Sequence, residues 1–276
     1  MATVELATKY LSIVDELFSQ ESKTSLVTHQ DFSWDGAHAV RVYSIGTASM
    51  NDYDRDGSGD TLSRYGTIEG LDATTQLMTL TNDRSFTFAI DRLDENETLQ
   101  ALAATDALAR QLRQVCIPEI DTYTYGVIAG GAGNTETAAL TESNIYTEIL
   151  KASEVLDNAL VPDTQRVILM PPSSYTLLKQ SGVILQTEIA QDMLLRGVVA
   201  MVDGALIVRV PMIRLPENCG FIMCHPSATV APMKLESFRI HNDPPGISGS
   251  LVEGRLVYDA FVMNNKTDGI YLHKTA

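Results

Sequence analysis

The sequence predicts an α+β protein, in which an alternating strand leads directly into one very long helix and further strands close the chain. Phe86, Phe88 and Ile90 alternate with small or polar residues, which is the period-2 pattern of a half-buried strand. Apolar residues then recur at helical spacing as far as residue 128. The last part of the chain contains three segments with strand character, at 233–241, 255–263 and 269–273.

The long helix is expected to cover residues 92–128. Its first turns are rich in carboxylates, which the positive end of the helix dipole favours, namely Asp91, Asp94, Glu95 and Glu97. Pro118 lacks an amide hydrogen and is expected to bend the helix rather than end it, because Ile120 resumes the apolar stripe. Counted from residue 94, such a helix would be about 50 Å long. A compact enzyme of this size seldom needs a rod of that length.

The N-terminal residues 3–18 predict an amphipathic helix, whose apolar face includes Tyr10, Leu11, Leu17 and Phe18. Residues 19–35 show no period, so this helix is expected to be tied loosely to the rest of the chain. Two interpretations stay open at this point. The helix docks on a neighbouring subunit, or it packs on the core of its own subunit.

Two strands, at 38–45 and 78–90, flank a polar excursion that is dotted with glycine and extends from residue 46 to about 77. Together they predict a long hairpin. An excursion of about 30 residues is longer than loops within compact domains usually are, so it is either functional or reaches outside the subunit.

The second half of the chain alternates between helical and strand patterns. Residues 129–136 (AGGAGNTE) are expected to form a flexible turn between domains. A helix over 145–160 is indicated by a stripe that consists of Ile145, Ile149, Ala152, Leu156 and Leu160. The remaining expected elements are helices at 173–180 and 184–195 and strands at 167–170, 205–210 and 221–224.

Composition excludes several classes of function. The chain has 276 residues, a formal net charge of −15 and 45% hydrophobic residues, values that fit a folded protein rather than a disordered one. The negative charge argues against sequence-specific nucleic-acid binding and against docking on anionic membranes. The three cysteines have neither a disulfide framework nor a zinc spacing, which suggests a reducing compartment. The sequence shows no signal peptide and no membrane-spanning run, so the protein is expected to stay in the cytoplasm where it is made.

No set of residues predicts catalysis, a cofactor or a metal site. Residues 52–60 (DYDRDGSGD) place carboxylates at several positions of a calcium loop, but Ser63 stands where the bidentate glutamate is needed. A solvated loop tip, whose Arg55 pairs across subunits, is the favoured interpretation. Gly131 and Gly133 are a fragment of a phosphate-binding loop without its lysine, and they follow a helix instead of a strand. We therefore expect a protein that is not an enzyme.

The order and spacing of several segments resemble major capsid proteins of tailed bacteriophages with the Hong Kong 97-type fold. The first segments are Tyr53-Asp54-Arg55-Asp56-Gly57, TLTNDRSFTFAIDRLDENET at 79–98 and IPEIDTY at 117–123. The later ones are RVILMPPSSYTLLKQS at 166–181, GALIVRVP at 204–211 and GRLVYDAFVMNNKTDGIYLHK at 254–274. The resemblance covers about residues 36–274.

The resemblance implies names for the parts of the chain. Residues 1–35 would be the N-terminal arm and residues 135–225 the axial domain. The peripheral domain would combine residues 36–134 and 226–276, and it would include the extended loop at 46–80 and the spine helix at 92–128.

The function that the resemblance implies is a major capsid protein, which assembles as hexamers and pentamers into an icosahedral shell around double-stranded DNA. Its partners would be other copies of the chain, a separate scaffolding protein, a portal, and DNA bound without sequence specificity, in a virion assembled in the bacterial cytoplasm. Contacts between subunits are expected at Tyr53, Arg55, Arg64 and Arg84 of the loop region and at the apolar arm residues named above. The alternatives are an encapsulin-type nanocompartment shell and, more remotely, a cytosolic α+β hydrolase.

Some members of the family cross-link their subunits by an isopeptide bond between a lysine of the extended loop and an asparagine of a neighbour. This sequence departs from that pattern, because residues 24–150 contain no lysine. The guanidinium groups of Arg55, Arg64 and Arg84 stay protonated and are not nucleophiles. Locking of the shell is therefore expected to be non-covalent.

Overall fold

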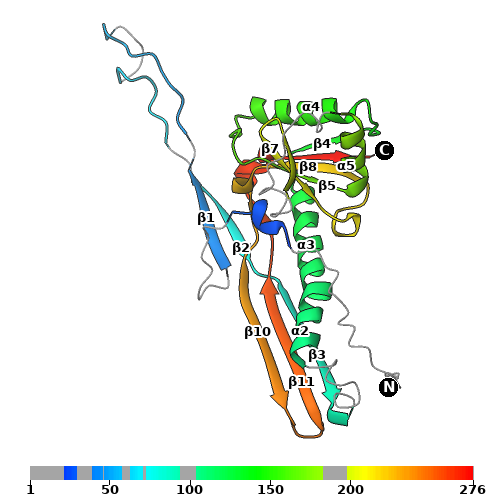
Figure 1. Cartoon of the computed structure of the whole chain (residues 1–276). Helices are drawn as coiled ribbons and strands as arrows, with labels where there is room; N and C mark the ends of the chain where they lie inside the picture. Colours follow the sequence, from blue (N-terminus) through cyan, green and yellow to red (C-terminus); the bar gives the residue numbers. More distant parts are fainter. Residues whose placement is uncertain are drawn as a thin grey trace. The chain divides into compact units, whose positions relative to one another are not determined.

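The computed structural model describes residues 22–29, 39–45, 47–57, 63–70, 73–93, 104–182 and 198–275. It has the α+β composition that the sequence predicts (Figure 1). The chain forms two compact units. The smaller is Gly36–Thr79, and the larger combines Met1–Asp35 with Leu80–Ala276.

A long helix is the longest element of the larger unit (Figure 1). It consists of α2 (Ala104–Gln111), the π-helical turn η2 (Leu112–Cys116) and α3 (Ile117–Gly130), which follow one another without a break. The helix continues through Pro118, as predicted. The amide of Ile117 bonds the carbonyl of Leu112, five residues earlier, so the wide turn lies directly before the proline that cannot donate. Residues 94–103, where we expected the helix to begin, lie outside the described part of the chain.

An antiparallel sheet of three strands, in the order β10-β11-β3, accompanies the first half of this helix. The strands are β3 (Asn82–Asp91), β10 (Met233–Asn242) and β11 (Gly249–Tyr258). Phe86, Phe88 and Ile90 of β3 pack against apolar residues of α2 and η2, so the predicted alternation is confirmed. Gly254 of β11 makes room for an aromatic ring, because a Cβ atom there would lie 2.4 Å from the ring of Phe86.

The predicted single strand at 78–90 is wrong, because the structure divides it between two sheets. β2 (Ala73–Thr79) pairs with β1 (Ala39–Ile45) in the smaller unit, whereas β3 belongs to the three-stranded sheet. Between them, the amide and hydroxyl of Thr81 both donate to the Asp259 carboxylate, each at 2.8 Å. These bonds take the place of ladder hydrogen bonds and end one strand before the next begins.

A six-stranded sheet in the order β4-β13-β8-β5-β7-β6 forms the second core of the larger unit (Figure 1). Its strands are β4 (Asn134–Thr137), β5 (Val167–Met170), β6 (Val198–Val202), β7 (Ala205–Arg209), β8 (Cys219–Cys224) and β13 (Ile270–Lys274). Val167 and Leu169 face a core that contains α3, and Ile168 and Met170 face one that contains α4 (Ile145–Asn158) and α5 (Pro172–Gln180). The sheet is therefore covered on both faces, which explains why β5 consists of apolar residues throughout.

The segment 129–136 is not the flexible turn that its glycines suggested. The helix extends to Gly130, and β4 begins at Asn134 and pairs with β13. Gly133 donates its amide to the carbonyl of Thr267 at 3.0 Å, and a Cβ atom on it would lie 2.7 Å from that backbone. A Cβ atom on Gly131 would lie 2.6 Å from Val262. Both glycines therefore serve close packing of the backbone, not flexibility.

Three other expectations need correction. Helix α4 ends at Asn158 rather than 160, and Leu160 has a left-handed backbone with φ of +56°. The strand expected at 255–263 is β11, which begins earlier and ends at Tyr258, followed by β12 (Phe261–Val262), which pairs with β9 (Thr229–Val230). Strands β4 and β6 were not predicted, and the helix expected at 184–195 lies outside the described residues.

The three cysteines, Cys116, Cys219 and Cys224, are buried free thiols. Burial raises the pKa of Cys219 and of Cys224 to about 12, so both stay protonated and unreactive at neutral pH. Over the described ranges, no helix has the length and apolar character needed to cross a membrane.

His273 of β13 is fully buried between Phe221, whose ring stacks on it at 5.0 Å, and Glu148, whose carboxylate lies 3.8 Å from Nε2. Burial lowers the pKa of His273 below its ordinary value of 6.5, although Glu148 and Glu136 oppose this shift. The unfolded chain therefore takes up a proton at a higher pH than the folded chain does. The stability that this histidine contributes is complete above pH 6.5 and is lost as the pH falls below that value.

We expect the free energy of unfolding to decrease below pH 6.5 and His273→Phe to make that decrease smaller. The decrease should not vanish, because burial also lowers the pKa of His225. Urea unfolding of the isolated chain at several pH values measures this dependence. An unchanged dependence in the variant would show that His273 does not carry it.

Candidate assembly surfaces

The smaller unit is a hairpin whose two arms are held together beyond its strands. β1 and β2 pair in register from Ala39 opposite Thr79 to Ile45 opposite Ala73. A hairpin therefore forms, but its second strand is Ala73–Thr79 and not the strand predicted at 78–90. Farther out, the hydroxyl of Ser49 bonds the carboxylate of Glu69 at 3.2 Å. Nearer the tip, the amide of Asp54 donates to the carbonyl of Arg64 at 2.9 Å.

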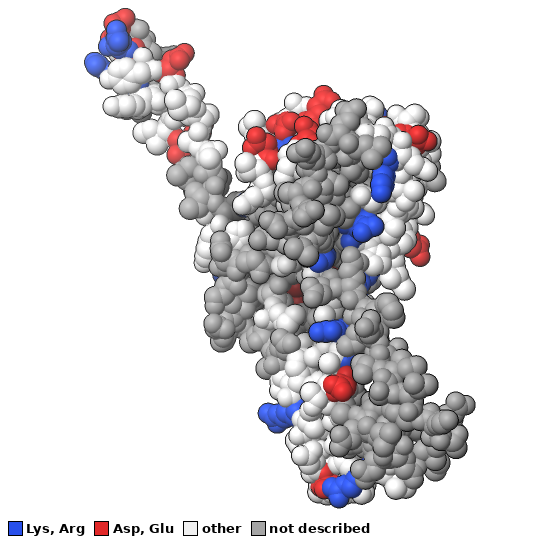
Figure 2. Space-filling view, viewed as in Figure 1, with Lys and Arg blue, Asp and Glu red and all other residues white. Residues whose placement is uncertain are grey.

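The tip of this hairpin brings together three residues that we predicted as assembly contacts. The rings of Tyr53 and Tyr65 meet edge to face at 5.0 Å. The Arg64 guanidinium lies close to Gly57, and Arg55 lies between these contacts in the sequence. The tip thus gathers Tyr53, Arg55 and Arg64 at one end of the unit, where Figure 2 shows both acidic and basic side chains.

The described part of the tip, up to Gly57, contains a tight turn around Asp54. One carboxylate oxygen of Asp54 accepts the amides of Asp56, at 3.2 Å, and of Gly57, at 2.9 Å. The carboxylate thus stabilises a tight turn. Within the described ranges, no three His, Cys, Asp or Glu side chains are grouped so that they could hold a metal ion.

Large apolar side chains of the smaller unit are exposed to an unusual degree. Met50 is 98% exposed, Ile68 84% and Tyr65 78%. Tyr43 and Leu77, on the two paired strands, are also exposed. Exposed apolar groups in such number usually mark a surface that another molecule covers.

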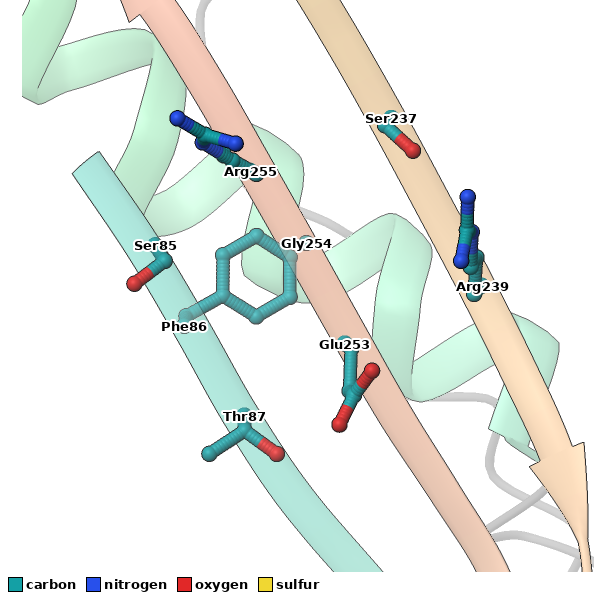
Figure 3. Close-up of a pocket in the computed structure, with 8 residues that line it drawn as sticks. All are labelled: Ser85, Phe86, Thr87, Ser237, Arg239, Glu253, Gly254 and Arg255. Carbon is teal, nitrogen blue, oxygen red and sulfur yellow. The ribbon is translucent and has the colours of Figure 1, made fainter. Parts of the chain in front are cut away.

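The three-stranded sheet presents a polar face on the side away from the long helix (Figure 3). Arg255 of the central strand β11 lies in register with Ser85 and Ser237, and Glu253 lies in register with Thr87 and Arg239. Together with Phe86 and Gly254, these side chains line a concavity of about 560 Å³. The polar side chains of this face contrast with the apolar face that packs on the helix.

Ion pairs cross this polar face. Arg255 bonds both carboxylate oxygens of Asp83, at 2.9 and 2.5 Å, and this pairing lowers the pKa of Asp83. Glu253 lies 3.4 Å from Nε2 of His241. Because these pairs are exposed, they contribute little to stability.

Arg84, a fourth predicted contact, forms an ion pair inside its own subunit. Its Nε atom lies 2.7 Å from the carboxylate of Glu119 on α3, and the hydroxyl of Tyr258 donates to the same oxygen at 3.3 Å. Burial, helped by the charge of Glu119, raises the pKa of Tyr258 to about 12, so the phenol stays a donor. Any contact that Arg84 makes with a neighbour must therefore share it with Glu119.

Residues 22–29 are not the loose connection that the lack of a period suggested. Val27 is fully buried in the core that α3 shares with the six-stranded sheet, and its carbonyl accepts the hydroxyl of Thr229. The amide of His29 donates to the carbonyl of Thr229 at 2.8 Å. This short segment is therefore a structural part of the larger unit.

A buried carboxylate on the long helix connects this segment to the body. Asp121 is 1% exposed, and its two oxygens accept the hydroxyl of Ser22, at 2.6 Å, and the guanidinium of Arg214, at 2.9 Å. Burial raises the pKa of Asp121 despite both partners. Three elements distant in sequence thus meet at one carboxylate, and we call these three residues the Asp121 cluster.

Sequence reasoning missed the Asp121 cluster, although the sequence contains a signal for it. Asp121 is the only carboxylate in residues 120–130 of the helix, and Arg214 is a single cation in an apolar stretch. Isolated charges in such surroundings usually have a buried partner. The predicted arm contacts Tyr10, Leu11, Leu17 and Phe18 lie outside the described residues.

Acidic side chains gather over α4, at the upper end of the larger unit in Figure 2. They include the exposed residues Glu142, Glu154 and Asp157. A negative face of this kind repels the phosphate backbone of nucleic acids. DNA contacts are therefore not expected on this side of α4.

No protein-family model and no curated protein matches the sequence. Solved structures do match it over almost the whole chain. A structure of Mycobacterium phage Che8 has a TM-score of 0.71 and 19% identity, and covers 99% of this chain and 98% of its own. The capsid of the Cyanophage P-SCSP1u has a TM-score of 0.73 and 14% identity, and covers 99% and 93%. The capsid of Myoviridae Phage XM1 has a TM-score of 0.66 and 11% identity, and covers 100% and 97%.

The chain has the fold of a phage capsid protein. This confirms the Hong Kong 97-type fold that the resemblance implied. Identity is far lower than structural similarity, so the capsid fold is maintained here by a different set of side chains.

The Asp121 cluster predicts a large effect of one substitution on the stability of the capsid fold. Asp121→Ala leaves the buried guanidinium of Arg214 without its carboxylate, and it should lower the free energy of unfolding by about 3–5 kcal/mol. The matched control is Asp83→Ala, which removes an exposed partner of Arg255 and should change stability little. Urea unfolding of the isolated chain compares the two variants, and equal effects would contradict the structural role given to Asp121.

Proposed function

We propose that this chain is the major capsid protein of a tailed phage, which assembles as hexamers and pentamers into an icosahedral shell around double-stranded DNA. The observation that carries the proposal is the similarity to several phage capsid structures, which extends over nearly the full length of both chains. A partial match would leave room for another function on the unmatched part. Here almost no part is left unmatched.

In this proposal, each part of the chain has a role in the shell. Residues 1–35 are the N-terminal arm and residues 135–225 the axial domain, which meets other axial domains at the centre of a capsomer. The peripheral domain consists of residues 36–134 and 226–276, with the extended loop at 46–80 and the spine helix at 92–128. The strand β13 at the end of this range pairs with β4 and β8 in the sheet of the axial domain. The separate compactness of Gly36–Thr79 supports an independent role for the loop.

The proposed assembly is geometric and needs no bond of high affinity. The extended loop lies over the spine helix of a neighbour, with Tyr53, Arg55 and Arg64 at its tip, and Arg84 contributes beside it. The exposed Met50, Tyr65 and Ile68 are the apolar groups that such a contact would cover. Many weak contacts, repeated in every subunit, then stabilise a closed lattice.

Other components complete the proposed virion. Scaffolding and portal functions come from separate proteins, and the shell is assembled in the cytoplasm of the bacterial host. The net charge of −15 fits DNA that is enclosed without sequence-specific contacts, because an acidic chain binds phosphates weakly. The arm, through Tyr10, Leu11, Leu17 and Phe18, ties adjacent subunits together.

We expect the purified full chain to form rings, sheets or shells at micromolar concentration, with a scaffolding protein supplied if one is encoded nearby. Sedimentation velocity measures the particle mass, and negative-stain electron microscopy shows the particle shape. The nucleic-acid content of native particles separates a phage shell from a nanocompartment that holds protein. A compact monomer under all conditions would exclude the proposed function.

The absence of lysine from residues 24–150 predicts how mature particles behave in denaturing conditions. Without an amine on the extended loop, no isopeptide bond forms there, so particles boiled in detergent and reductant should give one band near 30.1 kDa. Gel electrophoresis checks this directly. A ladder of oligomers, with a loop peptide in the cross-link by mass spectrometry, would show that locking is covalent.

A further inference from the structure

Leu160 is placed where neither the sequence pattern nor the local backbone favours a leucine. Leu160 is the last residue of the apolar stripe that runs along α4. The other members of this stripe are fully buried, namely Ile145, Ile149, Ala152 and Leu156. The helix ends two residues before Leu160, however, and the Leu160 side chain is 90% exposed. The last residue of the stripe is therefore exposed at the surface, although the pattern places it on the buried face.

The backbone around Leu160 forms a standard helix ending that normally contains a different residue. The amide of Val161 bonds the carbonyl of Leu156 at 3.0 Å, and the amide of Leu160 bonds the carbonyl of Asp157 at 2.9 Å. This arrangement requires a left-handed residue at position 160, and the φ of Leu160 is +56°. Glycine, or sometimes asparagine, adopts that conformation with least strain, whereas the Cβ atom of leucine makes it unfavourable.

The loop that presents Leu160 is held rigidly from beneath. Arg166 is 2% exposed, and its guanidinium donates to the carbonyls of Pro162, at 2.8 Å, and Val161, at 2.6 Å. The same group forms an ion pair with Asp157 at 2.6 Å. A contact on such a loop loses little conformational entropy when it forms.

We propose that Leu160 is a contact residue between copies of this chain, an inference that rests on the proposed shell function. A leucine that is 90% exposed buries little apolar surface in its own subunit, so the strain at this position points to a use in an interaction. The residues before it, Asp157, Asn158 and Ala159, are exposed and mostly polar, whereas Val161 is half-buried and Pro162 exposed. The apolar contact is therefore limited to Leu160 and its immediate neighbours.

The small size of this contact favours a second copy of the chain as its occupant. A stable complex with a single separate partner usually buries about 800 Å² on each side, which one leucine cannot supply. In a lattice, by contrast, the same small contact recurs in every subunit and acts together with all the others. Leu160 therefore fits a repeated contact within a shell better than a binding site for another protein.

The test uses full-length chains with Leu160→Gly and Leu160→Asn, compared with the unsubstituted chain. Both residues accept the left-handed backbone, so the melting temperature of the isolated subunit should stay the same or rise. The concentration threshold for assembly should rise about tenfold, because the apolar contact is lost. Light scattering against protein concentration measures the threshold.

The matched control is Gln165→Gly in the same loop. Gln165 is also exposed and left-handed, with φ of +62°, so this variant relieves the same kind of strain without removing an apolar side chain. It should raise or preserve the melting temperature and leave the assembly threshold unchanged. The comparison of the two variants therefore distinguishes the effect of relieving backbone strain from the effect of losing the apolar contact.

Three outcomes would overturn the inference. If the unsubstituted chain assembles and Leu160→Gly assembles at the same threshold, Leu160 is not a contact residue and the proposed shell function stands. If Leu160→Gly lowers the melting temperature, the leucine serves its own subunit. If the unsubstituted chain does not assemble under any condition, the shell function itself fails, and the contact fails with it.

Discussion

The structure of the larger unit depends on the packing of one helix, Ala104–Gly130, into two separate cores. Its first half lies against the three-stranded sheet, where Ala104 and Leu108 meet Ile90 and Val252. Its second half lies against the six-stranded sheet, where Tyr125 and Ile128 are almost fully buried. No other described element contributes to both cores, so the two sheets keep a fixed relation only while this helix is intact.

The π-helical turn explains how one helix can serve both sheets. Leu108, Leu112, Cys116 and Ile120 follow one another at steps of four residues. On a regular α-helix each such step rotates the side chain by about 40°, so the stripe would drift away from the sheet. A π-helical turn contains more residues and reverses part of this drift. The turn at Leu112–Cys116 therefore holds the stripe on the sheet, and Pro118 is tolerated beside it.

Much of the fold was predictable because local patterns determine it. The alternation in β3, the helix through Pro118, the first strand of the hairpin and most strands near the C-terminus follow from the period of apolar residues. The failures share a cause, since they depend on contacts distant in sequence. Gly131 packs against the side chain of Val262, and Gly133 packs against the backbone of Thr267. Asp121 bonds Arg214, which lies 93 positions later in the sequence. Of the candidate contacts, the tip residues Tyr53 and Arg64 were predictable, whereas the exposure of Leu160 depends on where α4 ends.

We propose that this chain closes a shell by repeated non-covalent contacts of a preformed subunit. The most direct test is a cryo-electron-microscopy reconstruction of particles assembled from the full chain. The account predicts a closed particle with rings of five and six subunits, in which the helix 104–130 keeps its π-helical turn and no density joins side chains of neighbouring subunits. Open filaments without fivefold rings, or continuous covalent density between subunits, would contradict it.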